Sequence, residues 1–243
     1  MSAPRFFVDT ACRPGLEVEL HADDAHHATH VLRMHGGDAL IVLHGGKAWD
    51  ATLIEGEAGA VRAHVAKSRD ESLGELPVGV SVLQALVKGA KFDDVVEKTV
   101  ELGARRIVPV HCERSYADAS RHRLDRWRRI ARSAAQQARR LHVPVIAEPM
   151  GWADALQAFR GDARPLVAYE NAPAGSFAEA LRGIAGARDI AIAIGPEGGL
   201  TAAEVEAARA AGCALVSLGP TILRTETAAA AMLAALAAGA GWW

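Results

Sequence analysis

Gly195-Pro196-Glu197-Gly198-Gly199 follows an apolar run at residues 190–194 and precedes a segment that opens with Thr201. The run predicts a buried strand, and Thr201 with Glu204 three positions later has the spacing of a capping box at the start of a helix. The stretch therefore predicts a glycine turn between a strand and a helix. Glycines in such a turn let a ligand approach the backbone closely.

A second unit of the same kind follows directly. Residues 214–218 predict a short buried strand, Gly219-Pro220 a turn, and residues 223–227 lead into an alanine-rich helix at 228–240. We expect the two turns to lie side by side, on adjacent strands at one edge of an α/β sheet, where small-molecule sites form. The alternative is that the glycines only make tight connections, but the charged residues in both turns favour a site. The turns lack the Lys-Ser/Thr ending of a P-loop and the three-glycine spacing of a dinucleotide-binding fingerprint, so a nucleoside triphosphate or NAD is disfavoured as the ligand.

The residues around both turns resemble the RsmE family of 16S rRNA uridine N3-methyltransferases, which belongs to the SPOUT class. The match includes residues 194–201, 218–220 and 222–228. It extends along the whole chain to Arg5, Phe6, Phe7, Val8, His27, Val31, Leu32, Arg33, Met34, Gly37, Asp38, Lys88, Gly89, Lys91, Lys98, Glu101, Leu102, Gly103, Pro109, Glu113, Arg114, Ser115, Gln137, Arg140 and Pro144.

The resemblance implies a fold and an assembly. It implies an α/β SPOUT methyltransferase domain with a trefoil knot, an exception to the rule that chains avoid threading, and a small N-terminal PUA-like RNA-binding β-barrel. It also implies a homodimer with each S-adenosylmethionine site beside the subunit interface. The small side chains of the last helix would ease its passage through the knot, although helix propensity and burial explain the alanines equally well.

The resemblance also implies methyl transfer from S-adenosylmethionine to N3 of a uridine in 16S rRNA, on free rRNA or within a 30S particle, without a metal. We assign the donor pocket to three loops. Their residues are Ala168, Tyr169, Glu170 and Asn171, then Ile194, Gly195, Pro196, Glu197, Gly198 and Gly199, then Leu218, Gly219, Ile222, Leu223 and Arg224.

Three charged residues beside these turns are candidates for catalysis. The guanidinium of Arg224 can hold uridine carbonyl oxygens or stabilise negative charge that develops at N3. Its alternative role is a salt bridge to Glu226 or Glu197. Either glutamate can assist proton removal, and either can equally cap a helix or contact a partner subunit.

Charge is unevenly divided along the chain, although its formal net charge is only -2. Lys and Arg outnumber Asp and Glu by 14 to 8 in residues 73–144, whereas acids outnumber bases by 11 to 7 before this segment and by 10 to 6 after it. Residues 121–140 predict a helix whose arginines are opposed nearby only by Asp125, so the cluster can hold phosphates. The alternative is a solvated face with salt bridges to acidic neighbours. We expect RNA contacts from Arg5, His27, Arg33, Lys88, Lys91, Arg114, Arg126, Arg129, Gln137 and Arg140.

Two domains are expected, at residues 1–72 and 73–243. Short β-like runs at 39–43, 48–54 and 61–65, separated by glycine turns, predict the barrel, and residues 67–77 a linker. Beyond the linker, residues 78–87 predict a strand, 92–102 a helix and 106–110 a strand. The alternation of strands and helices that follows predicts a parallel sheet covered by helices.

The remaining composition indicates the compartment. Cys12, Cys112 and Cys213 are far apart without a CxxC pair, and no signal segment or membrane span is expected, which favours a reducing cytoplasm. His26 and His30 would share a face of a helix, but such pairs are more often surface or RNA-contacting residues than metal ligands, so no metal is expected.

The chain departs from the family pattern at Thr221, where an arginine is common, and at Ser133 and Gln136, where acids are common. Contacts with the substrate base are therefore less secure than the fold. Two rival functions remain. Another SPOUT enzyme could methylate a different position, such as a ribose oxygen, or the chain could be a non-enzymatic RNA-binding or ribosome-assembly module.

Overall fold

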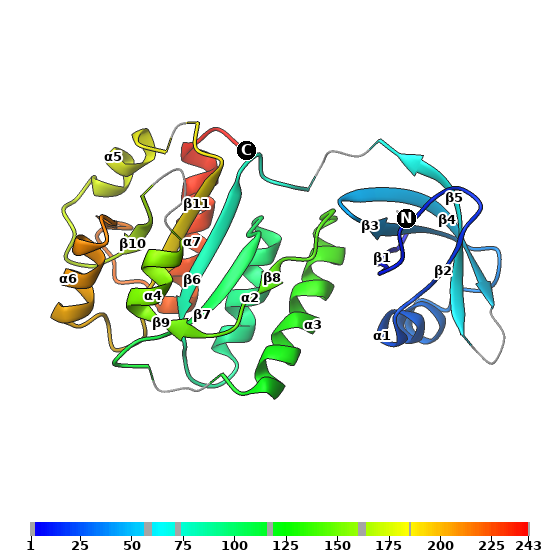
Figure 1. The fold of residues 1–243 in the computed structure, drawn as a ribbon, viewed down its shortest axis with the longest axis horizontal. Coiled ribbons are helices and arrows are strands. Elements are labelled where there is room, and N and C mark those ends of the chain that lie inside the picture. The colour runs from blue at the N-terminus through cyan, green and yellow to red at the C-terminus, as the bar shows by residue number, and fades with distance from the viewer. Residues whose placement is uncertain are drawn as a thin grey trace. The chain divides into compact units, whose positions relative to one another are not determined.

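The chain folds into two compact units, seen in the computed structural model (Figure 1). The structure describes residues 3–55, 60–70, 74–115, 119–159, 164–184 and 186–242. The first unit comprises Met1–Glu75 with Ala135–Val143, and the second Leu76–Ala134 with Pro144–Trp243. The predicted boundary between residues 72 and 73 lies outside the described residues.

The first unit is built on a curved sheet with the strand order β1-β3-β4-β5-β2. Its strands β1 and β3 are parallel, and the other pairs are antiparallel. Gly45 and Gly46, with φ of 56° and 76°, make the two-residue turn between β3 and β4, which positive φ at both positions suits. The three predicted β runs are confirmed, and β5 continues four residues further than expected. The elements are β1 Arg5–Phe7, β2 Glu17–Glu19, α1 Ala22–His26, the π-helical turn His27–Val31, β3 Ala39–His44, β4 Lys47–Glu55 and β5 Val61–Arg69.

The second unit has a parallel sheet with the order β12-β10-β11-β6-β7-β8, and β9 also pairs with β7. The central strands are mostly apolar because helices cover both faces. The strands are β6 Gly79–Ala85, β7 Arg106–His111, β8 Val145–Ile146, β9 Met150–Gly151, β10 Leu166–Ala168, β11 Asp189–Ile194 and β12 Ala214–Val216. The helices are α2 Lys91–Glu101, α3 Arg121–Gln137, α4 Trp152–Ala158, α5 Ser176–Arg182, α6 Ala202–Ala210 and α7 Thr225–Gly239.

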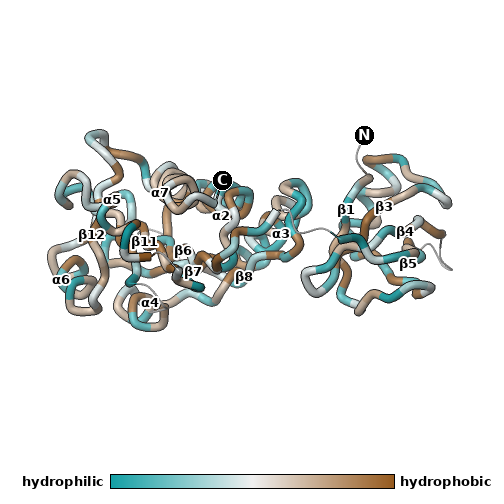
Figure 2. Tube along the Cα trace, turned by 90° about the horizontal axis from the view of Figure 1, so that it is seen from above, coloured by the Kyte–Doolittle hydropathy of each residue, from teal (hydrophilic) through white to brown (hydrophobic). Residues whose placement is uncertain are grey.

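Side chains that alternate along the strands pack against different helices. Leu83 and Ala85 of β6 lie in one core with residues of α4 and α6, such as Trp152 and Val205. The helices α2 and α7 pack together on the opposite face, as the view along the sheet in Figure 2 shows. The expected helix-covered parallel sheet is therefore confirmed.

One expectation about strand order is wrong. The strands β11 and β12 are not adjacent, because β10 lies between them and pairs in parallel with both. The predicted strand 214–218 is also shorter, ending at Val216. The three loops assigned to the donor pocket therefore lie at this edge of the sheet, and the loop after β10 is the central one.

The helix that follows the first glycine turn begins as predicted. Thr201 caps α6, its side chain accepting a hydrogen bond from the backbone N–H of Glu204 while the carboxylate of Glu204 accepts one from the backbone N–H of Thr201. Gly212, with φ of 77°, follows the end of this helix. Of the helices in the described part of the chain, none is long and apolar enough to cross a membrane.

Candidate active site

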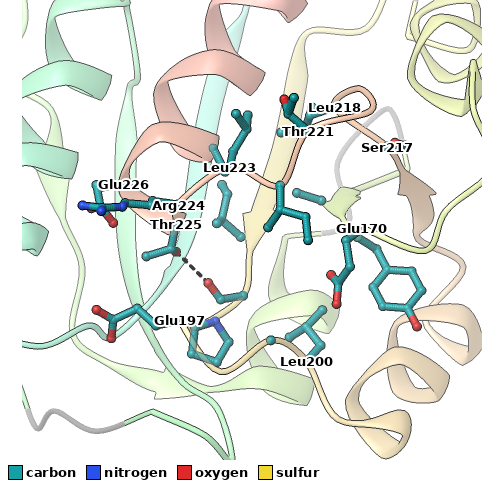
Figure 3. A pocket seen from close by; sticks show the side chains of 18 of the residues that line it. Glu170, Glu197, Leu200, Ser217, Leu218, Thr221, Leu223, Arg224, Thr225 and Glu226 are labelled. Atoms are coloured by element: carbon teal, nitrogen blue, oxygen red, sulfur yellow. Dashed lines mark hydrogen bonds between the residues drawn. The ribbon is translucent and has the colours of Figure 1, made fainter.

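A pocket of about 430 Å³ lies at the carboxyl ends of β10, β11 and β12 (Figure 3). This is where open α/β sheets bind ligands, and the volume lies within the usual range for small-molecule sites. Leu218, Ile222 and Leu223 give it an apolar wall, and Ile222 is 88% exposed. A large aliphatic side chain so exposed at a pocket rim gains burial when a ligand covers it.

The glycines of the turns leave room that a side chain would take. A Cβ at Gly195 would come within 2.9 Å of the Leu200 side chain. Gly199 and Gly219 have φ of 71° and 126°, in the left-handed region that glycine adopts without strain. The backbone thus forms part of the pocket wall.

The first turn is held at its far end by a buried carboxylate. Glu204 accepts hydrogen bonds from the backbone N–H and the hydroxyl of Thr201 and, at 2.8 Å, from the backbone N–H of Glu113. The indole N–H of Trp152 donates to the Glu204 carbonyl oxygen at 2.9 Å. These bonds fix the start of α6 to the end of β7, so the turn between β11 and α6 is rigidly supported.

The turn is also held from α7. The hydroxyl of Thr225, the first residue of α7, donates to the carbonyl oxygen of Gly195 at 2.7 Å, the dashed line in Figure 3. The same hydroxyl oxygen accepts from the amide of Gln84, a buried residue of β6. The second and third loops of the pocket are therefore linked through the start of α7.

Four charges lie at one side of the pocket. Lys91 forms an ion pair with Glu197, and this hydrogen bond raises the pKa of Lys91 and lowers the pKa of Glu197. A backbone hydrogen bond from Lys88 also lowers the pKa of Glu197. Figure 3 shows Glu197, Arg224 and Glu226 together, across the pocket from Glu170. Glu197 is therefore ionised, and Lys91 already balances its charge.

Arg224 and Glu226 differ from this pair. Arg224 is exposed and forms no ion pair with Glu226 or Glu197 in the described part of the chain, so the alternative role of Arg224 as a salt-bridge partner to them is not seen. The Oε2 atom of Glu226 is buried and has no hydrogen-bond partner among the described residues. A buried carboxylate oxygen without a donor is costly, and a ligand N–H would satisfy it.

Most of the residues predicted to hold the donor line the pocket. Asn171 and Gly198 do not: the side chain of Asn171 donates weakly to the Tyr169 hydroxyl at 3.4 Å, and the Gly198 carbonyl accepts from Arg114 at 2.8 Å. Lys91, predicted to contact RNA, lies in the pocket. The lining residues that had no predicted part in donor binding are Lys91, Leu200, Ser217, Pro220, Thr221, Thr225, Glu226 and Ala228.

The predicted basic helix is α3, but its arginines are more often paired than the local sequence indicates. Arg126 bonds Asp93 on α2 at 2.7 Å, and Arg128 bonds both Asp125 and Glu148. Asp125 is the local acid, as the sequence indicated, but the fold also brings the distant acids Asp93 and Glu148 to the helix, which is the alternative of salt bridges to acidic neighbours. Exposed cations without an ion pair in the described part of the chain include Arg121 and Arg129.

Of the other residues predicted to contact RNA, Lys88 and Arg114 lie in the second unit and the rest in the first. His27, Arg33 and Gln137 are exposed, and Arg33 has a φ of 53°. Arg5 and Arg140 are buried. The guanidinium of Arg140 is 1% exposed and bonds the Glu75 carboxylate at 2.6 Å, so Arg140 holds Glu75 and is not presented to a phosphate.

The histidine pair lies as its spacing predicts. The rings of His26 and His30 stack with centroids 4.4 Å apart. No group of three or more His, Cys, Asp or Glu suited to a metal occurs within the ranges that the structure describes. The cysteines are free, and burial raises the pKa of Cys112.

Known proteins resemble this chain over nearly its whole length. Residues 74–237 match the family described as an RNA methyltransferase domain, and residues 20–65 match an RNA methyltransferase PUA domain. The ribosomal RNA small subunit methyltransferase E of Mycobacterium bovis is 33% identical, covering 97% of this chain and 92% of the relative. The protein of that name from Bacillus subtilis is 31% identical, covering 88% and 87%.

A solved structure shares the fold. The crystal structure of a ribosomal RNA small subunit methyltransferase E from Neisseria gonorrhoeae, bound to S-adenosyl methionine, has a TM-score of 0.87 and 31% identity. The alignment covers 98% of both chains. A methyltransferase from Legionella pneumophila in complex with the cofactor SAM has a TM-score of 0.85 and 26% identity, with the same coverage.

Proposed function

Because the chain belongs to the RsmE family, the ribosomal RNA small subunit methyltransferases E, it is an S-adenosylmethionine-dependent rRNA methyltransferase, and we propose that it methylates N3 of a uridine in 16S rRNA. The observation that supports this most is the pocket at the carboxyl ends of β10, β11 and β12. Its glycine turns, apolar rim and four charges suit a ligand with an aromatic base at one end and charges at the other.

The residues present fit the methyl donor. Leu218, Ile222 and Leu223 would pack on the adenine, and the backbone of Gly195 and Gly199 would hold its polar edges. When bound, S-adenosylmethionine supplies a methyl group that the positive charge of its sulfonium already activates. The chain has then to exclude water, orient the uridine and receive the N3 proton, so correct placement should dominate the catalysis.

Arg224 is our candidate for orienting the base. It lies at the N-cap position of α7 and lines the pocket, and no carboxylate among the described residues neutralises its guanidinium. Negative charge develops on the uracil carbonyl oxygens as N3 loses its proton. A guanidinium fixed next to them stabilises that charge and holds the ring in line.

Glu226 is our candidate for the proton acceptor, in preference to Glu197. Lys91 binds Glu197 and lowers its pKa, which makes Glu197 a weaker base. The Oε2 atom of Glu226 is free to accept a proton or a hydrogen bond from N3. Glu197 would then serve to hold Lys91 over the first glycine turn.

We further propose that the RNA partner, 16S rRNA, is held electrostatically by α3. Arg121 and Arg129 support this most directly, since both are exposed cations outside the ion pairs of the helix. Arg126 is a weaker candidate because Asp93 already binds it, and that hydrogen bond raises its pKa. The exposed His27 and Arg33 of the PUA domain would add contacts that specify the site.

Three further properties remain predictions. We propose a homodimer with the donor site beside the interface, a cytoplasmic location, and a trefoil knot closed by α7. The packing of α7 against α2, α5 and β11 is compatible with a threaded helix, and free cysteines, two of them buried, suit a reducing compartment.

The test is transfer of labelled methyl from S-adenosylmethionine to 30S particles and to free 16S rRNA, followed by mass spectrometry of the nucleosides. We expect 3-methyluridine at one position. A different methylated nucleoside would overturn the assignment of uridine N3 but not the family. Failure to bind the donor at all would favour a binding or assembly module.

A further inference from the structure

Gln84 is an isolated polar side chain in the centre of the parallel sheet. It lies in β6 between Ile194 of β11 and Pro109 of β7, and it is 0% exposed. The neighbouring side chains of β6, Val82, Leu83 and Ala85, are apolar and also fully buried. A buried amide is costly unless its hydrogen bonds are made, so this position needs a reason.

The amide of Gln84 is committed to a single arrangement. Its Nε2 atom donates to the Thr225 hydroxyl at 3.0 Å and to the Ala85 carbonyl at 3.1 Å, while Oε1 has no partner among the described residues. The flipped amide would turn Oε1 toward the Ala85 carbonyl oxygen, so that two acceptors face each other, and would lose both donated bonds. The orientation with two donated bonds is therefore the favoured one.

This orientation dictates where the Thr225 proton goes. A hydroxyl has one hydrogen, and because its oxygen already accepts from Gln84, it must donate elsewhere. It donates to the Gly195 carbonyl at 2.7 Å. The three groups thus form a chain of hydrogen bonds, called the relay below, in which each donor points the same way. It runs from the amide in β6 through the first residue of α7 to the glycine turn of the donor pocket.

We propose that Gln84 and Thr225 are positioning residues, which hold the Gly195 carbonyl against the start of α7 and thereby set the shape of the donor pocket. The inference rests on the proposed function. Thr225 lies between Arg224 and Glu226 in sequence, and all three line the pocket. A shift of Thr225 would move the glycine turn and the two charged residues relative to one another.

The relay also explains the lack of another cap. The side chain of Arg224, at the N-cap position of α7, makes no capping hydrogen bond. Polar N-cap side chains usually fix a helix start to its own backbone. Here Thr225 and Gln84 fix the start of α7 to the sheet and to the glycine turn instead, which leaves the Arg224 side chain available to substrate.

The experiment compares Thr225→Val, Thr225→Ser, Gln84→Met and the double variant of Gln84→Met with Thr225→Val against wild type. Binding of S-adenosylhomocysteine is measured by calorimetry, and methylation of 30S particles gives KM for the donor, KM for the particle and kcat. Thr227→Val is the matched control, because Thr227 is exposed on the same helix. Circular dichroism establishes that each variant is folded.

We expect Thr225→Val to weaken S-adenosylhomocysteine binding about tenfold, because it leaves a buried N–H and a carbonyl without their partner. KM for the donor should rise similarly, with KM for the particle unchanged. Thr225→Ser keeps the hydroxyl and should bind within about twofold of wild type. Gln84→Met should weaken binding about fivefold, and the double variant should be no weaker than Thr225→Val alone, because both changes break one relay.

Three results would overturn the inference: folded Thr225→Val with wild-type affinity, equal effects of Thr225→Val and Thr227→Val, or additive effects in the double variant. If Thr225→Val does not fold, the test rests on Gln84→Met, and unchanged S-adenosylhomocysteine affinity in that variant refutes the proposal. Wild-type protein that binds no donor would refute the proposed function and, with it, the need for this positioning. Wild-type binding with unaffected variants refutes the positioning alone.

Discussion

Arg224 and Glu226 stand on either side of Thr225, and each contributes a different property to the pocket. Arg224 brings a positive charge without a partner carboxylate in the described chain, and Glu226 a buried carboxylate oxygen without a donor. Lys91 and Glu197 are already bound to each other. At the residue scale, the Lys91–Glu197 pair is already formed, whereas the Arg224 guanidinium and the Oε2 atom of Glu226 are available to a ligand.

Arg224→Ala should lower kcat for methylation by about 10²- to 10³-fold, the usual cost of losing a donor to a developing oxyanion. Binding of S-adenosylhomocysteine should change by less than about threefold, because the backbone of residue 224 stays in place. Arg224→Lys should recover only part of the rate, because a lysine lacks the planar fork. Unchanged turnover in Arg224→Ala would remove Arg224 from the catalytic role.

Glu226→Gln should lower kcat about 10²-fold or more if Glu226 receives the N3 proton. Glu197→Gln is the matched control, an identical change on the same side of the pocket, and it should have a smaller effect. Single-turnover methylation at saturating donor measures both. The opposite ranking of the two variants would transfer the role of proton acceptor to Glu197.

The Lys91–Glu197 pair predicts a pH dependence. Lys91 lowers the pKa of Glu197 below its ordinary 4.5 in the folded protein, so the pair contributes stability at neutral pH that is lost as the pH falls through this lowered pKa. Lys91→Met should lower Tm at pH 7, and the difference from wild type should shrink as the pH falls below 4.5. A difference that is constant from pH 7 to pH 3 would contradict this origin.

At the scale of elements, the sequence around α3 indicates more unpaired arginines than the fold leaves. Its arginine content is evident from the sequence, but Asp93 and Glu148, which pair with Arg126 and Arg128, lie 33 and 20 positions away. Charge counts along a chain do not include partners that the fold supplies. The helix itself, its apolar side around the buried Trp127 and its exposed arginines are all predictable from the local pattern.

Charge reversal at Arg121 and Arg129 together should weaken binding of 16S rRNA about tenfold near 0.1 M salt and reduce the dependence of log K on log salt by about two. Arg209→Glu, on the exposed side of α6, is the control and should have little effect. Reversal of Arg126 would be harder to interpret, because it also breaks the ion pair with Asp93, which binds the indole of Trp127. RNA affinity that does not move in the double variant would exclude α3 from the RNA surface.

The sheet shows where local signals end. Strands, glycine turns and the capping box of Thr201 and Glu204 are readable because each depends on neighbours in sequence. The place of β10 between β11 and β12 depends on long-range pairing, which no local pattern encodes. Gln84 gave a signal that could have been used, as a lone amide in an apolar strand, but its partner Thr225 lies 141 positions away.

At the scale of the whole molecule, the two units do not follow the chain in order. The first unit takes in Ala135–Val143 from the middle of the chain, and the buried Arg140 of that segment binds Glu75. Composition and the polar linker predict a single domain boundary. That Ala135–Val143 belongs to the first unit depends on tertiary contacts, which the local sequence does not encode. Burial of Arg140 is therefore something that only the fold reveals.

The proposed dimer is tested by the mass of the protein in solution. Light scattering during gel filtration should give about twice the chain mass of 25.6 kDa. The mass should hold on dilution to the nanomolar range, since family resemblance places the donor site beside the interface and the active form would need the partner. A monomer that still methylates would refute this part of the proposal.

The position of the pocket in the chain has a consequence for synthesis on the ribosome. Apart from Lys91, every residue that lines it falls between 168 and 228, whereas the first unit is complete at Val143. A growing chain therefore completes its PUA unit before it acquires the three loops of the donor pocket, and the start of α7 is the last part of the pocket to be made. A chain arrested between these points would contain the PUA unit without the donor pocket, so synthesis through α7 is itself a condition for methylation.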